Sequence, residues 1–369
     1  MKRAVAVWIL PLLAAAALSG CDSAPSTGTF EKTWGQPGAE LGNFVKPRGL
    51  AVDAKRGFVY VADMSGRIQK FDLDGGALAS RRLPATELGT SEGLAVTSGG
   101  DLLVADTHYH RVLRYRFPSG TAGAAGAAET AGAPGGLWQP LPGEGSPNPY
   151  VIGERGDGPG QFRFPIAVAV DKDDNFYVSE YGGNDRVQKF DAGGRFLRSW
   201  GTLGSGPGQF LRPSGIAVEA GGSVLVADAA NHRVQRFTPE GEFLAEWGRL
   251  GTAPGELHYP YDVAALPDGS FLVAENYNHR LQRFAADGTP LGVFGGPGPE
   301  PGRFSRPWCL ASAGGGVVYV SDTMNHRVQR LRFESEGSAQ NAASSKPLAA
   351  AKADHPLPTA HRPLPTKVR

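Results

Sequence analysis

The sequence contains little cysteine and almost no net charge, and both shortages restrict its function. Cys21 and Cys309 are the only cysteines among 369 residues, which excludes a disulfide-rich scaffold. The 37 basic residues nearly balance the 36 acidic residues, so the formal net charge is +1. A nucleic-acid-binding protein needs a basic face, and this balance argues against one. The 52 glycines and 29 prolines favour many tight turns over long helices.

Long hydrophobic runs are also scarce, apart from one near the start. Lys2 and Arg3 precede an apolar run over residues 5–18, which Pro11 interrupts. The run is too short for a comfortable membrane span and is typical of a secretory signal peptide, residues 1–20. Removal of those residues leaves 35 basic residues against 36 acidic ones. Export, like neutrality, argues against nucleic acid as a partner.

The signal-like run ends in Leu18-Ser19-Gly20-Cys21. This segment resembles the lipobox of bacterial lipoproteins, in which an aliphatic and two small residues precede a cysteine that is acylated and becomes the new N-terminus. The resemblance implies lipidation of Cys21, a short tether over residues 21–29, and an extracytoplasmic protein held to a membrane of the bacterial cell envelope. An ordinary signal with a chance cysteine is the alternative. The choice between inner and outer membrane stays open.

A repeat dominates the rest of the chain. Three consecutive copies share an aromatic-glycine pair, a glycine-rich turn, a proline with an apolar run, an acidic residue after an apolar run, and Asn-His-Arg. Arg233, Arg280 and Arg327 are 47 residues apart. Three less regular copies precede them, giving six. In these copies the recurring acidic residue and arginine are Asp63 and Arg67, Asp106 and Arg111, and Glu180 and Arg186.

This pattern resembles the NHL repeat family over residues 30–333, and the resemblance implies a β-propeller. The residues support that fold independently, because each copy holds four short β-rich runs separated by turn residues. In the fourth copy the runs are 215–219, 223–228, 233–237 and 243–247, named strands a to d. The predicted fold is all-β, a six-bladed β-propeller with four-stranded blades.

The two ends of the repeat region predict how the ring closes. The last copy has runs at 308–312, 317–322 and 327–333 but no strand d. Residues 30–34 match a strand d and are predicted to complete that blade. A low-complexity insertion, 118–149, separates strands c and d of the second copy, and a Pro/Ala-rich tail, 334–369, is predicted to be disordered. The tether, the insertion and the tail would then all leave from one face of the ring, here called the bottom. The hypothesis is that this bottom face is turned toward the membrane.

Residues present in every copy are interpreted as structural. The acidic residue that ends strand b and the arginine that opens strand c are expected to form charge-assisted hydrogen bonds that hold each blade together. His232, His279 and His326 belong to the repeat and are expected to cap loops rather than to bind zinc, because they lie on different blades.

Function is expected where the copies differ. The residues directly after the proline of each copy, or at the equivalent position in copy two, ring the top of the central channel. They are Arg48, Glu92, Ile166, Ser214, Tyr261 and Trp308. With Asp262 one residue deeper, Arg48, Glu92, Tyr261 and Trp308 form the candidate ligand-binding site, which would suit a small polar ligand or a peptide end. A packed, inert plug is the alternative. The loop of copy two, His108 to His110, departs from the repeat. Its two histidines could contact a metal ion, and the favoured alternative is that they are ordinary surface residues.

A related enzyme family gives the second function class. The peptidyl-hydroxyglycine amidating lyase is a six-bladed NHL propeller whose zinc is held by histidines directly after the proline of three blades. None of the matching positions here is a histidine, and a zinc site needs about three such ligands. The streptogramin-lyase type has seven blades. We therefore assign no catalytic residue, metal or cofactor and expect a scaffold that binds an envelope protein or small ligand; a metal-dependent lyase or hydrolase is the alternative.

Overall fold

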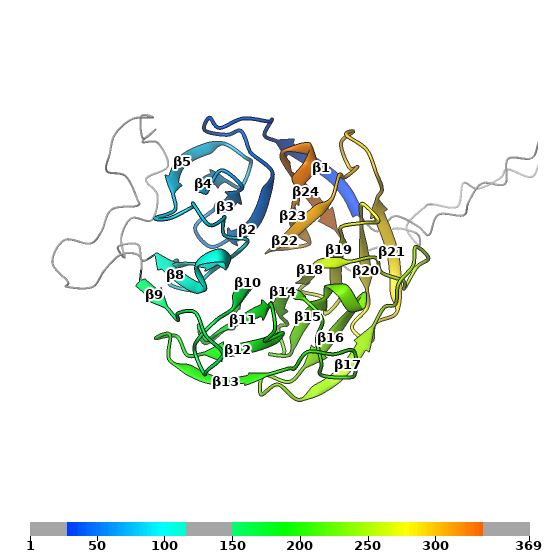
Figure 1. The fold of residues 1–369 in the computed structure, drawn as a ribbon. Coiled ribbons are helices and arrows are strands. Elements are labelled where there is room, and N and C mark those ends of the chain that lie inside the picture. The colour runs from blue at the N-terminus through cyan, green and yellow to red at the C-terminus, as the bar shows by residue number, and fades with distance from the viewer. Residues whose placement is uncertain (1–27, 116–149, 335–369) are drawn as a thin grey trace, which may run out of the picture. The chain divides into compact units, whose positions relative to one another are not determined.

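The computed structural model describes residues 28–115 and 150–334, and these residues form a ring of six antiparallel sheets (Figure 1). Every sheet has four strands, so the predicted six-bladed β-propeller is confirmed. No helix in the described residues is both long and apolar enough to cross a membrane. The signal peptide, Cys21, the insertion 118–149 and all but the first residue of the predicted tail lie outside the described residues.

Each blade runs from an inner strand a to an outer strand d. Blade 1 contains β2 (Pro47–Asp53), β3 (Phe58–Asp63), β4 (Arg67–Asp72) and β5 (Ala77–Arg82). Blade 2 contains β6 (Gly93–Val96), β7 (Leu102–Asp106), β8 (Arg111–Tyr115) and β9 (Tyr150–Ile152). Blade 3 contains β10 (Phe164–Val170), β11 (Phe176–Tyr181), β12 (Arg186–Phe190) and β13 (Phe196–Trp200).

The second half of the ring repeats this order. Blade 4 contains β14 (Pro213–Val218), β15 (Val224–Asp228), β16 (Arg233–Phe237) and β17 (Phe243–Trp247). Blade 5 contains β18 (Pro260–Ala265), β19 (Phe271–Glu275), β20 (Arg280–Phe284) and β21 (Pro290–Gly295). Blade 6 contains β22 (Pro307–Gly314), β23 (Val317–Asp322), β24 (Arg327–Phe333) and, from the other end of the chain, β1 (Gly28–Trp34).

The ring closes through the outer strand of blade 6. Strand β1 pairs antiparallel with β24, from Gly28 opposite Phe333 to Trp34 opposite Val328 (Figure 1). This confirms the predicted closing strand, with one correction. The strand begins two residues before the predicted residue 30, so Gly28 and Thr29 belong to it and not to a tether. Backbone hydrogen bonds between distant parts of the chain therefore hold the first and last blades together.

The core lies between neighbouring blades. Strand β15 is wholly buried, and its alternate side chains serve two different gaps. Val224 and Val226 pack toward blade 3, whereas Leu225 and Ala227 pack toward blade 5. Because each central sheet is covered on both faces, short strands of five or six residues suffice to bury a continuous core.

Every blade has an ion pair between strands b and c, and in blades 1, 3, 4, 5 and 6 its arginine also fastens the loop that arrives from the preceding blade. In blade 4, Arg233 Nε donates to Asp228 Oδ2 at 2.9 Å, and its Nη atoms donate to the carbonyl oxygens of Ser205 and Gly206 at 2.8 Å. The Leu211 N–H donates to Asp228 Oδ1 at 2.8 Å. The other pairs are Asp63–Arg67, Asp106–Arg111, Glu180–Arg186, Glu275–Arg280 and Asp322–Arg327. The acidic and basic residues that recur in the sequence are therefore structural, as interpreted.

The repeated histidines connect neighbouring blades. His232 follows the short 3-10 helix η2 (Ala229–Asn231) with a left-handed φ of 57°, and its Nδ1 accepts the Tyr259 N–H of blade 5 at 3.1 Å. His279 and His326 make the same bond to the next blade, and Asp185 does so with one carboxylate oxygen. The donors are the backbone N–H groups of Arg306, Lys46 and Arg212. The ring nitrogens thus have a structural acceptor role.

We expect the buried carboxylate–arginine pairs to contribute substantially to the free energy of unfolding. Arg233→Ala leaves the Asp228 carboxylate buried without its cation, which costs about 3–5 kcal/mol of unfolding free energy. The matched control is Arg195→Ala, because Arg195 pairs with Asp191 while 79% of its side chain is exposed, and an exposed pair contributes little. Urea unfolding of both variants measures the difference. Equal losses would contradict the structural role given to the buried pair.

Candidate functional site

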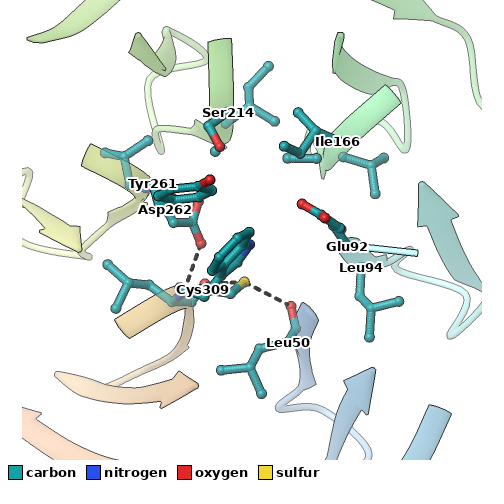
Figure 2. Close-up of a pocket in the computed structure, with 16 residues that line it drawn as sticks. Leu50, Glu92, Leu94, Ile166, Ser214, Tyr261, Asp262 and Cys309 are labelled. Atoms are coloured by element: carbon teal, nitrogen blue, oxygen red, sulfur yellow. Dashed lines mark hydrogen bonds between the residues drawn. The ribbon is translucent and has the colours of Figure 1, made fainter. Parts of the chain in front are cut away.

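The inner strands of all six blades surround a cavity of about 80 Å³ in the central channel (Figure 2). This volume has room for several water molecules. The top face of the ring is defined as the face that carries the d–a and b–c loops, and the bottom face carries the a–b and c–d turns. The cavity lining includes Leu50, Glu92, Ile166, Ser214, Tyr261, Asp262, Trp308 and Cys309.

Four of the five predicted site residues meet at the top of this cavity. Arg48 forms an ion pair with Glu92, which is only 8% exposed. The Arg48 guanidinium also lies over the Trp308 ring, 4.2 Å from its centroid. Trp308 packs against Tyr261 with ring centroids 4.0 Å apart. Figure 2 shows Glu92 and Tyr261 reaching into the cavity from opposite sides. The predicted neighbours are therefore in contact, across blades 1, 2, 5 and 6.

The structure adds two residues that the sequence interpretation missed. Arg212 donates from Nη2 to the Tyr261 hydroxyl at 3.4 Å, and its guanidinium lies 5.1 Å from the centroid of Tyr181. These two residues bring blades 3 and 4 into the set. The six side chains that close the channel mouth are named the entrance cluster: Arg48, Glu92, Tyr181, Arg212, Tyr261 and Trp308.

Arg212 was missed because it precedes the proline instead of following it. In four blades this preceding residue has a left-handed backbone, with φ between 50° and 58°, and carries a cationic or aromatic side chain. These residues are Lys46, Arg212, Tyr259 and Arg306. A left-handed conformation is uncommon outside glycine. The variation of this position between copies could have identified Arg212 as a candidate site residue from the sequence.

Asp262 lies in the channel wall below the entrance cluster. Its Oδ2 accepts the Leu310 N–H of blade 6 at 2.7 Å, and its Oδ1 accepts the Val263 N–H at 2.9 Å. Burial raises the pKa of Asp262 to about 7, although these hydrogen bonds lower it. Gly215 leaves the necessary room, because a Cβ there would lie 1.9 Å from Asp262 Oδ1. Asp262 therefore joins blade 5 to blade 6, and it lines the same cavity as Glu92, Tyr261 and Trp308.

Cys309 lies beside Asp262 and is a neutral thiol. Burial, followed by the neighbouring carboxylate, raises its pKa well above the usual range. Its Sγ is 3.9 Å from the Leu50 carbonyl oxygen. A thiol that resists ionisation is a poor nucleophile, so this cysteine is a wall residue.

The electrostatics of the entrance cluster centre on Glu92. Burial raises the pKa of Glu92, and the positive charges of Arg48, His108 and Arg212 oppose that shift. The Nε atoms of Arg48 and Arg212 are buried, and neither has a hydrogen-bond partner among the described residues. The cluster thus pairs one carboxylate with two guanidinium groups whose bonding capacity is only partly used.

The divergent loop of blade 2 holds other loops in place. His108 Nδ1 is 3.3 Å from the Thr90 carbonyl oxygen. Tyr109 donates its hydroxyl to Glu87 Oε2 at 2.9 Å, and His110 Nδ1 contacts the Arg163 carbonyl oxygen. Within residues 28–115 and 150–334, no group of three or more His, Cys, Asp or Glu side chains is placed to hold a metal ion.

Comparison with known proteins agrees with this architecture. The family model for the NHL repeat matches residues 92–115, 210–237, 257–284 and 304–331. No curated protein matches the chain. Among solved structures, a streptogramin B lyase is 13% identical with a TM-score of 0.52, over 82% of this chain and 98% of that one.

Two further solved structures are similar in fold. Virginiamycin B lyase from Staphylococcus aureus is 15% identical, with a TM-score of 0.52 over 83% of this chain and 100% of its own. A gluconolactonase from Xanthomonas campestris is 13% identical, with a TM-score of 0.53 over 85% of this chain and 98% of its own. At these identities the likeness shows the fold alone.

The protonation of Asp262 gives a pH prediction. Its pKa rises from 3.8 to about 7 on folding, so its contribution to stability is fully present below pH 4 and is lost as pH rises to 7, by about 4 kcal/mol. Asp262→Asn cannot ionise, although it satisfies only one of the two N–H donors. We expect the wild type to melt higher than the variant at pH 4.5 and this gap to narrow at pH 7.5. A gap that does not change with pH would contradict the assignment.

Proposed function

We propose that this chain, a six-bladed β-propeller of NHL repeats, is a non-catalytic binding module of the bacterial envelope. Its entrance cluster would hold an envelope protein segment or a small polar ligand. The main support for this proposal is that each of the six blades contributes a side chain to the entrance cluster. These side chains are not part of the repeated sequence pattern. Repeated residues such as Asp228 and Arg233 explain the scaffold, whereas the cluster residues differ from blade to blade.

The chemistry of the cluster supports binding better than a purely structural plug. Trp308, Tyr261 and Tyr181 offer aromatic faces, and Arg48 and Arg212 offer donors that the protein does not fully use. A concave site with aromatic walls and a few convergent polar groups is the usual form of a ligand pocket.

An enzymatic role is the second candidate, and one observation favours it. Asp262 has a pKa near 7 and faces the cavity, which suits a general acid or base. Both of its oxygens, however, accept backbone N–H groups. The metal-dependent lyase or hydrolase alternative predicts stoichiometric zinc or calcium in the purified protein, which elemental analysis measures directly.

The membrane anchor is part of the proposal. Gly28, Tyr115, Tyr150 and Phe333 are the strand ends nearest in sequence to the three segments outside the described residues, and the antiparallel order of the strands puts all four at the bottom face. A lipid on Cys21 would therefore attach at the face opposite the entrance cluster. The proposed arrangement leaves the entrance cluster turned away from the membrane and open to a partner.

We expect Cys21→Ser to abolish acylation, since serine has no thiol to modify. In a detergent phase-separation assay on cells producing each protein, the wild type should partition into the detergent phase and the variant into the aqueous phase. Intact mass spectrometry should show the added acyl mass on the wild type alone. Equal partitioning of the two proteins would contradict the anchor.

The binding function is tested by crosslinking in cells. We expect the wild type to capture a defined partner or ligand that a triple variant, Arg48→Ala, Tyr261→Ala and Trp308→Ala, does not capture, because the variant removes the aromatic and cationic surface. A control variant with Lys172→Ala and Glu240→Ala alters turns on the bottom face and should capture normally. Identical capture by all three proteins would overturn the assignment of the entrance cluster as the binding site.

A further inference from the structure

The two arginines of the entrance cluster have more positive charge than the protein itself neutralises. Arg48 pairs with Glu92 through a single Nη1 atom. Arg212 has no ion pair among the described residues, and its one side-chain hydrogen bond there goes to the Tyr261 hydroxyl. The cluster therefore holds two cations against one carboxylate, in a partly buried place where an unpaired charge is costly.

The two guanidinium groups reach the entrance cluster from opposite sides of the ring. Arg48 comes from blade 1 and Arg212 from blade 4, which are three blades apart among six. Both nevertheless act electrostatically on Glu92, on Tyr181 and on Tyr261. A group bound at the centre of the mouth would thus lie within the field of both arginines.

We propose that the entrance cluster recognises a carboxylate group, carried on an aromatic or aliphatic body and held between Arg48 and Arg212. This rests on the proposed binding function and names the chemistry of its ligand. A free organic acid and the C-terminal carboxylate of a peptide share that chemistry, and the experiment below separates them.

The shape of the site favours a planar monoanion. A guanidinium presents its donors in a fork that matches a carboxylate with two hydrogen bonds. Within the entrance cluster, the Nε atoms of Arg48 and Arg212 are buried donors that lack a partner among the described residues. Trp308, Tyr261 and Tyr181 would pack against the apolar body of the ligand. A doubly charged anion would suit the mouth less well, because Glu92 stays in it.

Binding would change the protonation of Glu92. A ligand that takes Arg48 leaves Glu92 without its ion-pair partner, and burial already raises the pKa of Glu92. The groups that face Glu92 are Arg48, His108, Arg212, Tyr181 and Tyr261, and only the first three lower that pKa. Glu92 should then take up a proton as the ligand binds, so affinity should rise as pH falls.

The test is isothermal titration calorimetry of the full chain with four probes. Two are small molecules, phenylacetate and its neutral amide, and two are the peptide Gly-Gly-Phe with a free or an amidated C-terminus. We expect each carboxylate to bind at least about tenfold more tightly than its amide, which is the loss of one charge-assisted pair. Tighter binding of the free peptide than of phenylacetate assigns the site to peptide ends, and the reverse assigns it to free acids.

Variants locate the binding. Arg212→Gln should weaken carboxylate binding at least about tenfold, whereas the exposed control Arg195→Gln should not. Glu92→Gln removes the competing charge, so it should strengthen carboxylate binding and abolish proton uptake, measured in two buffers of different ionisation enthalpy. This variant keeps the size of the side chain and so tests the proposal even if Arg212→Gln folds poorly.

Two outcomes would overturn the inference. Equal binding of acids and amides would do so, and so would carboxylate binding that Arg212→Gln and Glu92→Gln both leave unchanged. Either result could stand beside a partner that is lost with the triple variant, in which case the binding function holds and only the carboxylate chemistry fails. If carboxylates bind as predicted but the triple variant captures the same partner as the wild type, the proposed binding function is refuted. The carboxylate site itself would still stand.

Discussion

A carboxylate–arginine pair with a fully buried carboxylate joins strand b to strand c in every blade and organises the loops around it. In blade 4 it joins Asp228 and Arg233 to the loop that arrives from blade 3, through both backbone N–H and carbonyl groups. That loop ends at Arg212. The Asp228 carboxylate holds the neighbouring Leu211 N–H, and Asp185 of blade 3 accepts the Arg212 N–H at 2.7 Å, so these scaffold contacts also set the position of a side chain in the entrance cluster. A scaffold feature present in every blade thereby positions the residues that differ between blades.

In blade 2, part of the hydrogen-bond network around the carboxylate–arginine pair is missing. Asp106 keeps its bond to Arg111 at 2.8 Å, but its Oδ1 is buried without a partner among the described residues. The glutamine that bonds the carboxylate in blade 4, Gln235, is replaced by Leu113. The same blade supplies Glu92, the one carboxylate of the entrance cluster. The least regular copy thus contributes the charge that distinguishes the mouth.

The fold was predictable because its information is local and repeated. Each blade has the same order of apolar runs and turn residues, and residues 30–34 matched a strand d by its own short pattern. The boundaries of β16, β17, β23 and β24 agree with the prediction to the residue. The extension of β1 to Gly28 was not predicted, because pairing with Phe333 and not residue type extends that strand.

The site was predictable only in part. Equivalent strand positions on six blades must surround the channel, which placed Arg48, Glu92, Tyr261 and Trp308 together. Arg212 and Tyr181 reach the same mouth from a loop and from the end of a strand b, and the left-handed backbone that directs Arg212 cannot be seen in the sequence.

A crystal structure of the protein soaked with phenylacetate, at a concentration that saturates it in solution, would locate the bound carboxylate directly. We predict that the carboxylate lies between the guanidinium groups of Arg48 and Arg212, with the phenyl ring against Trp308 or Tyr261. A saturated protein whose ligand lies elsewhere, with the Arg48–Glu92 pair intact and the mouth empty, would contradict this prediction.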